Sequence, residues 1–209
     1  MKKVFSIAAV AIAMLFAGTT QAQKNNLTVN IGYAPQTFNT VTTILNTDTK
    51  TSMDMTGFFA GVGYTSAVTP NLGLTVGAQA RYNYKNEENK LYKINHTQFL
   101  IDVPVMLSFG IQLGNDARLG IFAGPAFSFA VQGKTIKTIK LTDSDDDDDW
   151  YEDGDDRQRF DISGAAGLSL QFRTVRLYGG YRMGFLDLNK NNNIKTTTQG
   201  LFVGLGYCL

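Results

Sequence analysis

Apolar and polar side chains alternate with a period of two along most of the chain, as in β-strands whose two faces meet different environments. In residues 72–84, Leu, Val, Ala and Tyr occupy the even positions, and Gly, Thr, Gln, Arg and Asn occupy the odd positions. The same alternation recurs in seven other segments, so the sequence predicts eight strands. The predicted strands are 27–33, 58–64, 72–84, 98–113, 119–129, 160–172, 175–185 and 201–209.

The length of these strands and the character of their two faces indicate a membrane barrel. Most hold about 9 to 14 residues, whereas strands of soluble proteins most often have about 5–6 and a tilted membrane-spanning strand needs about 9–11. The apolar face carries no charge, and the other face holds 15 of the 21 glycines. A soluble, lipocalin-like barrel would present Lys and Glu to water, whereas small residues fit the inside of a narrow barrel. We therefore expect an all-β fold, an eight-stranded antiparallel transmembrane β-barrel with a filled lumen.

The connections between the predicted strands alternate between short and long. The short turns lie near 69–71, 114–116 and 173–174. The long polar segments are 36–52, 85–97, 132–158 and 188–197. Short periplasmic turns and long extracellular loops are typical of outer-membrane barrels. Within this scheme we expect Pro104 and Pro125, which interrupt strands, to lie at bulges, and Met53 and Met55 to lie above the membrane.

The first residues have the features of an export signal. Basic residues Lys2 and Lys3 precede an apolar run over 4–17, and small side chains stand just before Gln23. This order is typical of a secretory signal peptide. We expect residues 1–22 to be the signal peptide and 23–209 to be the barrel domain.

Composition excludes several classes of site. One Cys and one His exclude an internal disulfide and a site built from several His or Cys ligands. The formal charge of +1 provides no basic field for nucleic acid. We expect no cofactor and no nucleic-acid partner, and a small buried thiol at Cys208, with intermolecular pairing as the alternative.

Five motifs resemble the Bacteroidota-type outer-membrane β-barrel domain family, which includes the PorT-like proteins. They are LIDVPVML at 100–107, GIFAGP at 120–125, FDISG at 160–164, YGGYRMG at 178–184 and LFVGLGY at 201–207. The resemblance spans the chain after the leader and implies location in the bacterial outer membrane and a role in structure, surface interaction or secretion. Such barrels often end in Phe, which the barrel-assembly machinery reads. This chain ends at Leu209, so Tyr207 or Leu209 is expected to serve instead.

Four charged residues fall on the predicted inner face. Arg81 and Asp102 lie on neighbouring strands, and so do Asp161 and Arg182. Charges inside a narrow lumen need partners, so we expect an ion-pair network that fills the barrel, with a proton relay as the alternative. Eight strands enclose little more than side chains, which argues against a wide pore.

His96 is the only histidine and lies near the predicted outer rim. Barrels that modify lipid A use a His with a Ser or an acid at this rim, and Asn95 and Thr97 do not complete such a set. We expect no special role for His96, with catalysis as the alternative.

Residues 143–156 hold ten of the 18 acidic residues, around Trp150 and Tyr151. We expect a solvated, self-repelling loop, with specific calcium binding and partner binding through the two aromatic residues as alternatives. The irregular spacing of the acids predicts weak and unselective binding of Ca²⁺ and Mg²⁺. The candidate ligands are Asp145, Asp147, Asp149 and Asp153.

Three functions remain open on the sequence alone. The first is a non-enzymatic outer-membrane barrel with a structural, surface-interaction or secretion and assembly role. The second is an enzyme that modifies lipid A in the outer leaflet and requires His96. The third is a narrow small-solute or ion channel past Arg81 and Arg182. The expected partners are outer-membrane lipid, lipopolysaccharide and the barrel-assembly machinery, and we expect a monomer.

Overall fold

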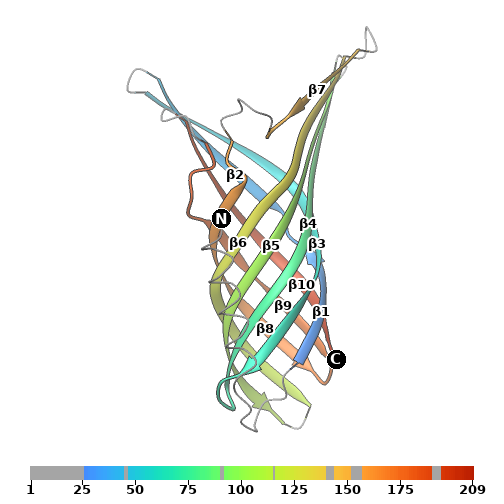
Figure 1. The fold of residues 1–209 in the computed structure, drawn as a ribbon, viewed down its shortest axis with the longest axis vertical. Coiled ribbons are helices and arrows are strands. Elements are labelled where there is room, and N and C mark those ends of the chain that lie inside the picture. The colour runs from blue at the N-terminus through green and yellow to red at the C-terminus, as the bar shows by residue number, and fades with distance from the viewer. Residues whose placement is uncertain are drawn as a thin grey trace, which may run out of the picture.

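Ten antiparallel strands make up nearly all of the structure (Figure 1). The structure, a computed structural model, describes residues 26–44, 47–89, 92–114, 116–139, 144–151, 157–189 and 194–209. The strands are β1 (Asn26–Tyr33), β2 (Gln36–Ile44), β3 (Thr47–Ala67), β4 (Leu72–Glu88), β5 (Tyr92–Leu113), β6 (Ala117–Ile139), β7 (Ser144–Asp149), β8 (Phe160–Phe172), β9 (Val175–Gly184) and β10 (Ile194–Cys208). None of the described residues belongs to a helix long and apolar enough to cross a membrane. The predicted signal peptide lies outside the described residues.

The strands close into a ring of eight, as predicted. β1 and β2 are two parts of one barrel strand, because both pair with β3 on one side and with β10 on the other. The strand is interrupted at Ala34 and Pro35, because the backbone nitrogen of proline carries no hydrogen to donate to the ladder. The ring then runs β3-β4-β5-β6-β8-β9-β10 and returns to β1. β7 stands outside the ring and pairs only with β6.

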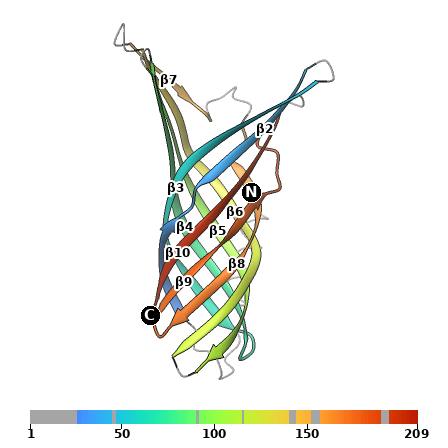
Figure 2. The same cartoon turned by 180° about the vertical axis from the view of Figure 1, so that it is seen from behind.

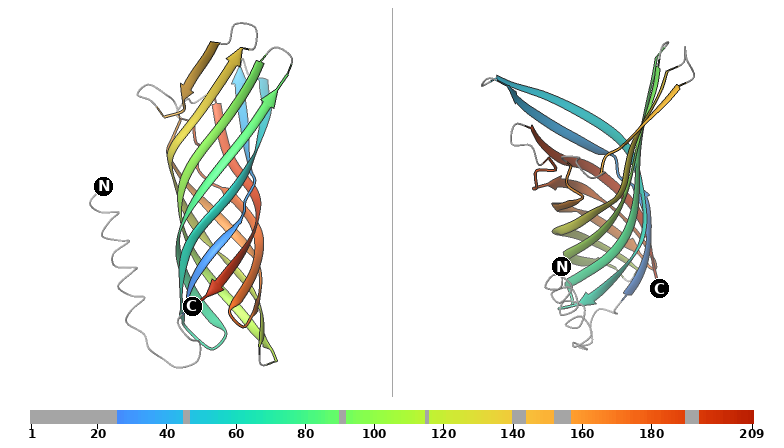
Figure 3. Two further views of the ribbon diagram at one scale, coloured as in Figure 1. Left: turned by 90° about the vertical axis from the view of Figure 1, so that its right-hand side faces the viewer. Right: turned by 45° about the horizontal axis from the view of Figure 1, so that its top comes forward.

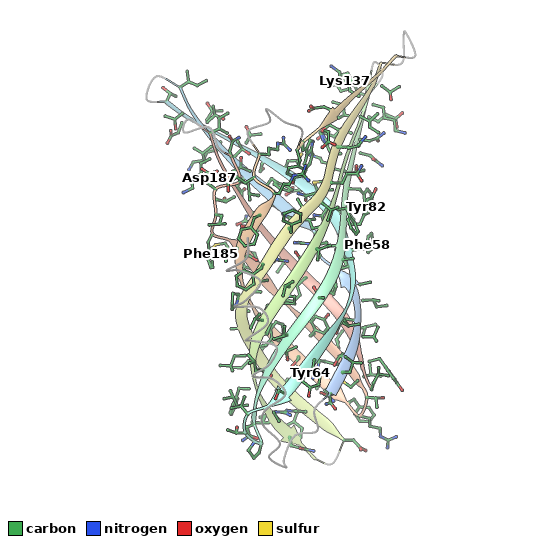
Figure 4. The ribbon with its side chains drawn as sticks, in the orientation of Figure 1. Phe58, Tyr64, Tyr82, Lys137, Phe185 and Asp187 are labelled. Atoms are coloured by element: carbon green, nitrogen blue, oxygen red, sulfur yellow. The ribbon has the colours of Figure 1, made fainter. Side chains whose placement is uncertain are left out.

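The wall has the two faces that the period of two predicts. Apolar residues of alternate positions are exposed on the outside, among them Ile31, Leu168 and Leu201 at 58%, 63% and 65%. Phe58 on β3, Tyr82 on β4 and Phe185 after β9 point outward from the wall (Figure 4). An uninterrupted apolar exterior on a closed barrel is the surface that a lipid bilayer covers.

The strands continue past the ring in two arms, so the predicted long connections over 36–52, 85–97 and 132–158 consist largely of paired strands where the structure describes them. In the predicted connection 188–197, residues 194–197 belong to β10. One arm is the β2–β3 hairpin, and the other consists of the ends of β4, β5 and β6 with β7 (Figures 1 and 2). The arms diverge from each other, as the tilted view shows (Figure 3). Most side chains of these extensions are polar, so the sequence shows no sustained alternation there even though the backbone pairs.

The opposite end has the predicted short turns. β5 and β6 are joined around Gly114, whose φ of 78° favours glycine. β8 and β9 are joined by Arg173 and Thr174, and Arg173 adopts a positive φ of 51°. The described chain begins and ends on this side (Figure 1).

The two prolines inside strands do not create bulges, so that prediction was wrong. The β4–β5 ladder is interrupted at Pro104 and the β5–β6 ladder at Pro125, and neither interruption changes the register. Each proline removes one N–H donor from one ladder, and the register of the two strands is the same on both sides of it. The bulge lies instead at Val131, which has no partner between the pairs Phe99↔Gln132 and Leu100↔Ala130.

Candidate functional site

Arg81 and Asp102 form the predicted ion pair inside the barrel. Arg81 Nε lies 3.0 Å from Asp102 Oδ2, and Nη2 donates a hydrogen bond to Oδ1 at 3.1 Å. Both side chains are almost completely buried, at 6% and 2% exposure. The guanidinium group of Arg81 and the carboxylate of Asp102 therefore face each other through two contacts.

Arg182 also binds Asp102, which corrects the expected pairing of Arg182 with Asp161. Arg182 Nη1 lies 3.0 Å from Asp102 Oδ2, although β9 and β5 are not neighbours in the ring. Arg182 further donates to the hydroxyl groups of Ser128 and Ser163, both at 2.6 Å. One carboxylate thus joins two guanidinium groups across the lumen.

Asp161 lies at the edge of this layer. Its Oδ2 accepts a hydrogen bond from Thr198 Oγ1 at 2.8 Å, while Oδ1 is buried with no hydrogen-bond partner among the described residues. Gly184 makes this position possible, because a Cβ there would lie 2.8 Å from Asp161 Oδ2. Asp161 therefore contributes charge to the layer without a direct ion pair.

A second layer inside the barrel is aromatic. Phe59, Phe122, Tyr178 and Phe202 lie with neighbouring ring centroids 6.0–6.4 Å apart. Glycine on the neighbouring strand gives these rings space, since Gly204 of β10 is the register partner of Tyr178 and a Cβ there would lie 2.6 Å from the Tyr178 ring. The small residues of the inner face therefore match the large ones, which explains the glycine content of that face.

Beside these layers the lumen holds a cavity of about 160 Å³. Its wall includes Arg81, Asp102 and Arg182 at one end and Arg118 and Arg176 at the other. The sequence predicted a filled lumen, and the side-chain layers occupy it together with this cavity.

Trp150 closes the barrel at the end of the two arms. It is 2% exposed and packs with Phe38 and Met55, and its ring lies edge-on to Phe38 at 6.3 Å. Gly133 lets it approach the wall, because a Cβ there would lie 2.8 Å from the Trp150 ring. Arg157 covers the ring at 4.3 Å. We call Phe38, Met55 and Trp150 the aromatic plug.

Over residues 144–151, the described part of 143–156, the structure has a strand and the plug residue Trp150 in place of the expected loop. Asp145 to Asp149 belong to β7, which pairs with the part of β6 that carries Lys134 and Lys137. The acidic residues therefore extend a sheet, and the chain after β7 turns back into the mouth of the barrel.

The candidate cation ligands are not brought together as a site. The Asp149 carboxylate accepts a hydrogen bond from the backbone N–H of Tyr151 at 3.1 Å, while Asp145 and Asp147 lie in β7. Asp153 lies outside the described residues. Among those that the structure describes, no group of three His, Cys, Asp or Glu residues could hold a metal ion.

His96 has a partner that the sequence did not predict. Its Nδ1 lies 3.0 Å from Thr135 Oγ1, and Trp150 Nε1 donates to the same oxygen at 2.6 Å. Partial burial lowers the pKa of His96. Thr135 escaped prediction because the bulge at Val131 reverses the alternation and turns the following odd positions of β6 inward.

Cys208 occupies the predicted inward position in the last strand. It is buried, and its Sγ accepts a hydrogen bond from Thr28 Oγ1 at 3.7 Å.

A family model described as "Outer membrane protein beta-barrel domain" matches residues 21–190. The chain belongs to this family. Together with the closed barrel and its apolar exterior, membership places the protein in the bacterial outer membrane. No curated protein matches the sequence at a significant level.

Several solved outer-membrane proteins have similar folds. The Ail protein of Yersinia pestis is 14% identical, with a TM-score of 0.47 over 90% of this chain and 100% of that chain. Neisserial surface protein A is 14% identical, with a TM-score of 0.44 over 86% and 96%. The outer membrane protease OmpT of Escherichia coli is 9% identical, with a TM-score of 0.43 over 91% and 100%. At these values the similarity carries no argument about activity.

Proposed function

We propose that the protein is a non-enzymatic outer-membrane barrel whose two extracellular arms act in surface interaction, with a PorT-like part in secretion or assembly as one version of that role. The observation that carries this proposal is the contrast between the two parts of the molecule. The lumen is occupied by an ion-pair layer and closed by the aromatic plug, while paired strands project beyond it as ordered surfaces.

The arms present strand edges that another polypeptide can use. Over Thr47–Asp54, β3 pairs with β2 alone, and β7 pairs with β6 alone. Exposed strand edges carry unpaired backbone N–H and C=O groups, which can accept an added strand. Lys137 stands near the tip of one arm and adds charge to the surface there (Figure 4).

We propose three partners: outer-membrane lipid, lipopolysaccharide and the barrel-assembly machinery. The apolar exterior suits outer-membrane lipid and lipopolysaccharide. Tyr207 and Leu209, the candidate signals for the barrel-assembly machinery, are 52% and 67% exposed on the outer face. We propose a monomer, since closure of the barrel leaves no open edge within the ring.

A shortened arm tests the proposal in cells. Thr40 and Thr51 face each other in the β2–β3 register, so residues 41–50 can be removed and replaced by a two-residue Asn-Gly turn. We expect a deletion strain to lose secretion or envelope integrity, and the shortened chain not to restore it. The matched control is Arg173→Gln, an exposed residue in the turn at the opposite end of the barrel, which keeps both arms and should restore the phenotype. Full restoration by the shortened chain, present in equal amounts in the membrane, would contradict the proposal.

One contact favours a second candidate, an enzyme acting on outer-leaflet lipid. The distance of 3.0 Å between His96 Nδ1 and Thr135 Oγ1 allows a base and a nucleophile to exchange a proton. The two side chains lie beneath Trp150, however, and Trp150 already donates to the hydroxyl oxygen. A change in lipid A mass between the wild type and His96→Ala would support the enzyme.

The cavity gives the third candidate, a narrow channel, its own support. A conducting path would have to pass the Arg81–Asp102–Arg182 layer and the aromatic plug. Stepwise conductance of the purified protein in planar bilayers would support a channel, and its absence would support a closed barrel.

A further inference from the structure

The periplasmic half of the lumen holds two arginines that the ion-pair layer does not use. Arg118 is the second residue of β6 and Arg176 is the second residue of β9, and both line the cavity. Gly110 makes room for Arg118, since a Cβ there would collide with its guanidinium group. Arg118 and Arg176 are both register partners of Gln171 on β8, so the two residues lie at the same level of the barrel, two strands apart.

No carboxylate balances these charges within the described wall of the cavity. Its acidic member, Asp102, is bound to Arg81 and Arg182 in the other half of the lumen. Asp116 lies outside the lumen in the β5–β6 turn and pairs with Arg173 at 3.3 Å. Two like charges inside a barrel of low dielectric constant repel each other, and this repulsion has a free-energy cost. An anion bound between them replaces the repulsion with attraction to both charges.

Most of the donors of this pair are unused. Arg118 Nη2 donates to the Asn71 carbonyl oxygen at 3.2 Å, and Arg176 Nη2 donates to Gln171 Oε1 at 3.2 Å. A guanidinium has five N–H donors, so several remain on each side chain. The buried hydroxyl of Tyr178 also has no hydrogen-bond partner among the described residues, and Arg176 lies near it.

We propose that Arg118, Arg176 and Tyr178 form a binding site for one small oxyanion, a carboxylate or a phosphate, that enters from the periplasmic end. Two planar guanidinium groups provide the paired donors that carboxylate and phosphate oxygens accept. The adjoining cavity of about 160 Å³ accommodates a small solute, and both arginines are only half-buried, so solvent reaches them. The site is independent of the proposed role of the arms.

The test is a binding titration of the folded full-length barrel in a phosphate-free detergent. Inorganic phosphate and acetate are titrated separately at constant ionic strength by calorimetry. We expect saturable binding, at least tenfold weaker in Arg118→Gln and in Arg176→Gln, because each removes charged hydrogen bonds. Tyr178→Phe keeps both charges and should weaken binding several-fold. Tighter binding of phosphate assigns the site to phosphate groups, and tighter binding of acetate assigns it to carboxylates.

Arg173→Gln is the matched control, because it removes the same charge at the same end of the barrel but outside the lumen. It should bind the anion as the wild type does. Heat-modifiable gel mobility shows that each variant is folded. Absence of saturable binding of both anions by the wild type would overturn the proposal. Unchanged affinity in both lumen arginine variants, or an equal loss in Arg173→Gln, would also overturn it.

Discussion

Arg182 on β9 reaches across the lumen to Asp102 on β5, with Nη1 3.0 Å from Oδ2, although the two strands are not neighbours in the ring. Because Arg81 binds the same carboxylate, Asp102 connects three strands, β4, β5 and β9. A contact of this kind holds opposite walls together, which adjacent-strand hydrogen bonds do not do. The stability of the barrel should therefore depend strongly on Asp102.

Replacement of Asp102 by Asn should destabilise the barrel by about 3–5 kcal/mol, because two buried guanidinium groups lose their counter-charge. The free energy of unfolding by urea, measured in lipid vesicles, checks this. Asp116→Asn is the matched control, since it removes an equivalent carboxylate from an exposed ion pair with Arg173 and should change little. Similar unfolding midpoints for the two variants would contradict the structural role of Asp102.

The inner glycines should differ in their tolerance to substitution. A Cβ at Gly32 would collide with the Val203 carbonyl oxygen and the Phe59 ring, so Gly32→Ala should cost about 1–3 kcal/mol of stability. At Gly63 the nearest atom would be Asn30 Nδ2 at 3.5 Å, an ordinary contact. Gly63→Ala should leave the urea midpoint nearly unchanged, and equal losses in both variants would show that the Phe59 contact is not responsible.

The inward and outward positions of the strands could be predicted from sequence because they depend only on a local period of two. That period placed Arg81 and Asp102 together and put apolar residues on the outside. It could not predict that Arg182 meets Asp102, because this contact depends on the stagger of strands that are distant in the ring.

Three features near the arms could not be predicted from sequence, for other physical reasons. The β2–β3 arm is rich in Thr and has few apolar residues, so it shows no sustained alternation. Val131 adds one residue to β6, so the parity that holds up to Ala130 is reversed at Thr135. Trp150 enters the barrel because the chain turns back after β7, and an acidic composition gave no sign of that turn.

Trp150 should report a buried environment and respond little to cations. It is the only tryptophan, so its emission should be blue-shifted and poorly quenched by acrylamide. Ca²⁺ and Mg²⁺ should give shallow, similar changes that salt weakens, because the candidate ligands Asp145, Asp147 and Asp149 lie along a strand. Met55→Ala removes the side chain packed beneath the ring and should red-shift the emission. A sharp response to micromolar Ca²⁺ alone would instead reveal a selective site.

Acid should loosen the aromatic plug through His96. His96 faces Thr135 and Trp150 from the part of β5 in the arm, with Lys85, Glu87 and Arg157 nearby. Burial is the main cause that lowers its pKa, and the positive charges of Lys85 and Arg157 act in the same direction, against an opposing effect of Glu87.

The unfolded chain therefore binds a proton more readily than the folded barrel near the usual histidine pKa of about 6.5. The stability that neutral His96 contributes is complete above that pH and is lost as the pH falls below it. The ring centroids of Trp150 and His96 lie 6.1 Å apart. As the pH falls from 7.5 to 5, the emission of Trp150 should therefore shift to the red and be quenched more readily by acrylamide. His96→Gln cannot titrate in this window and should abolish the change, whereas Lys85→Gln should retain it. An identical pH profile in His96→Gln would assign the transition to another group.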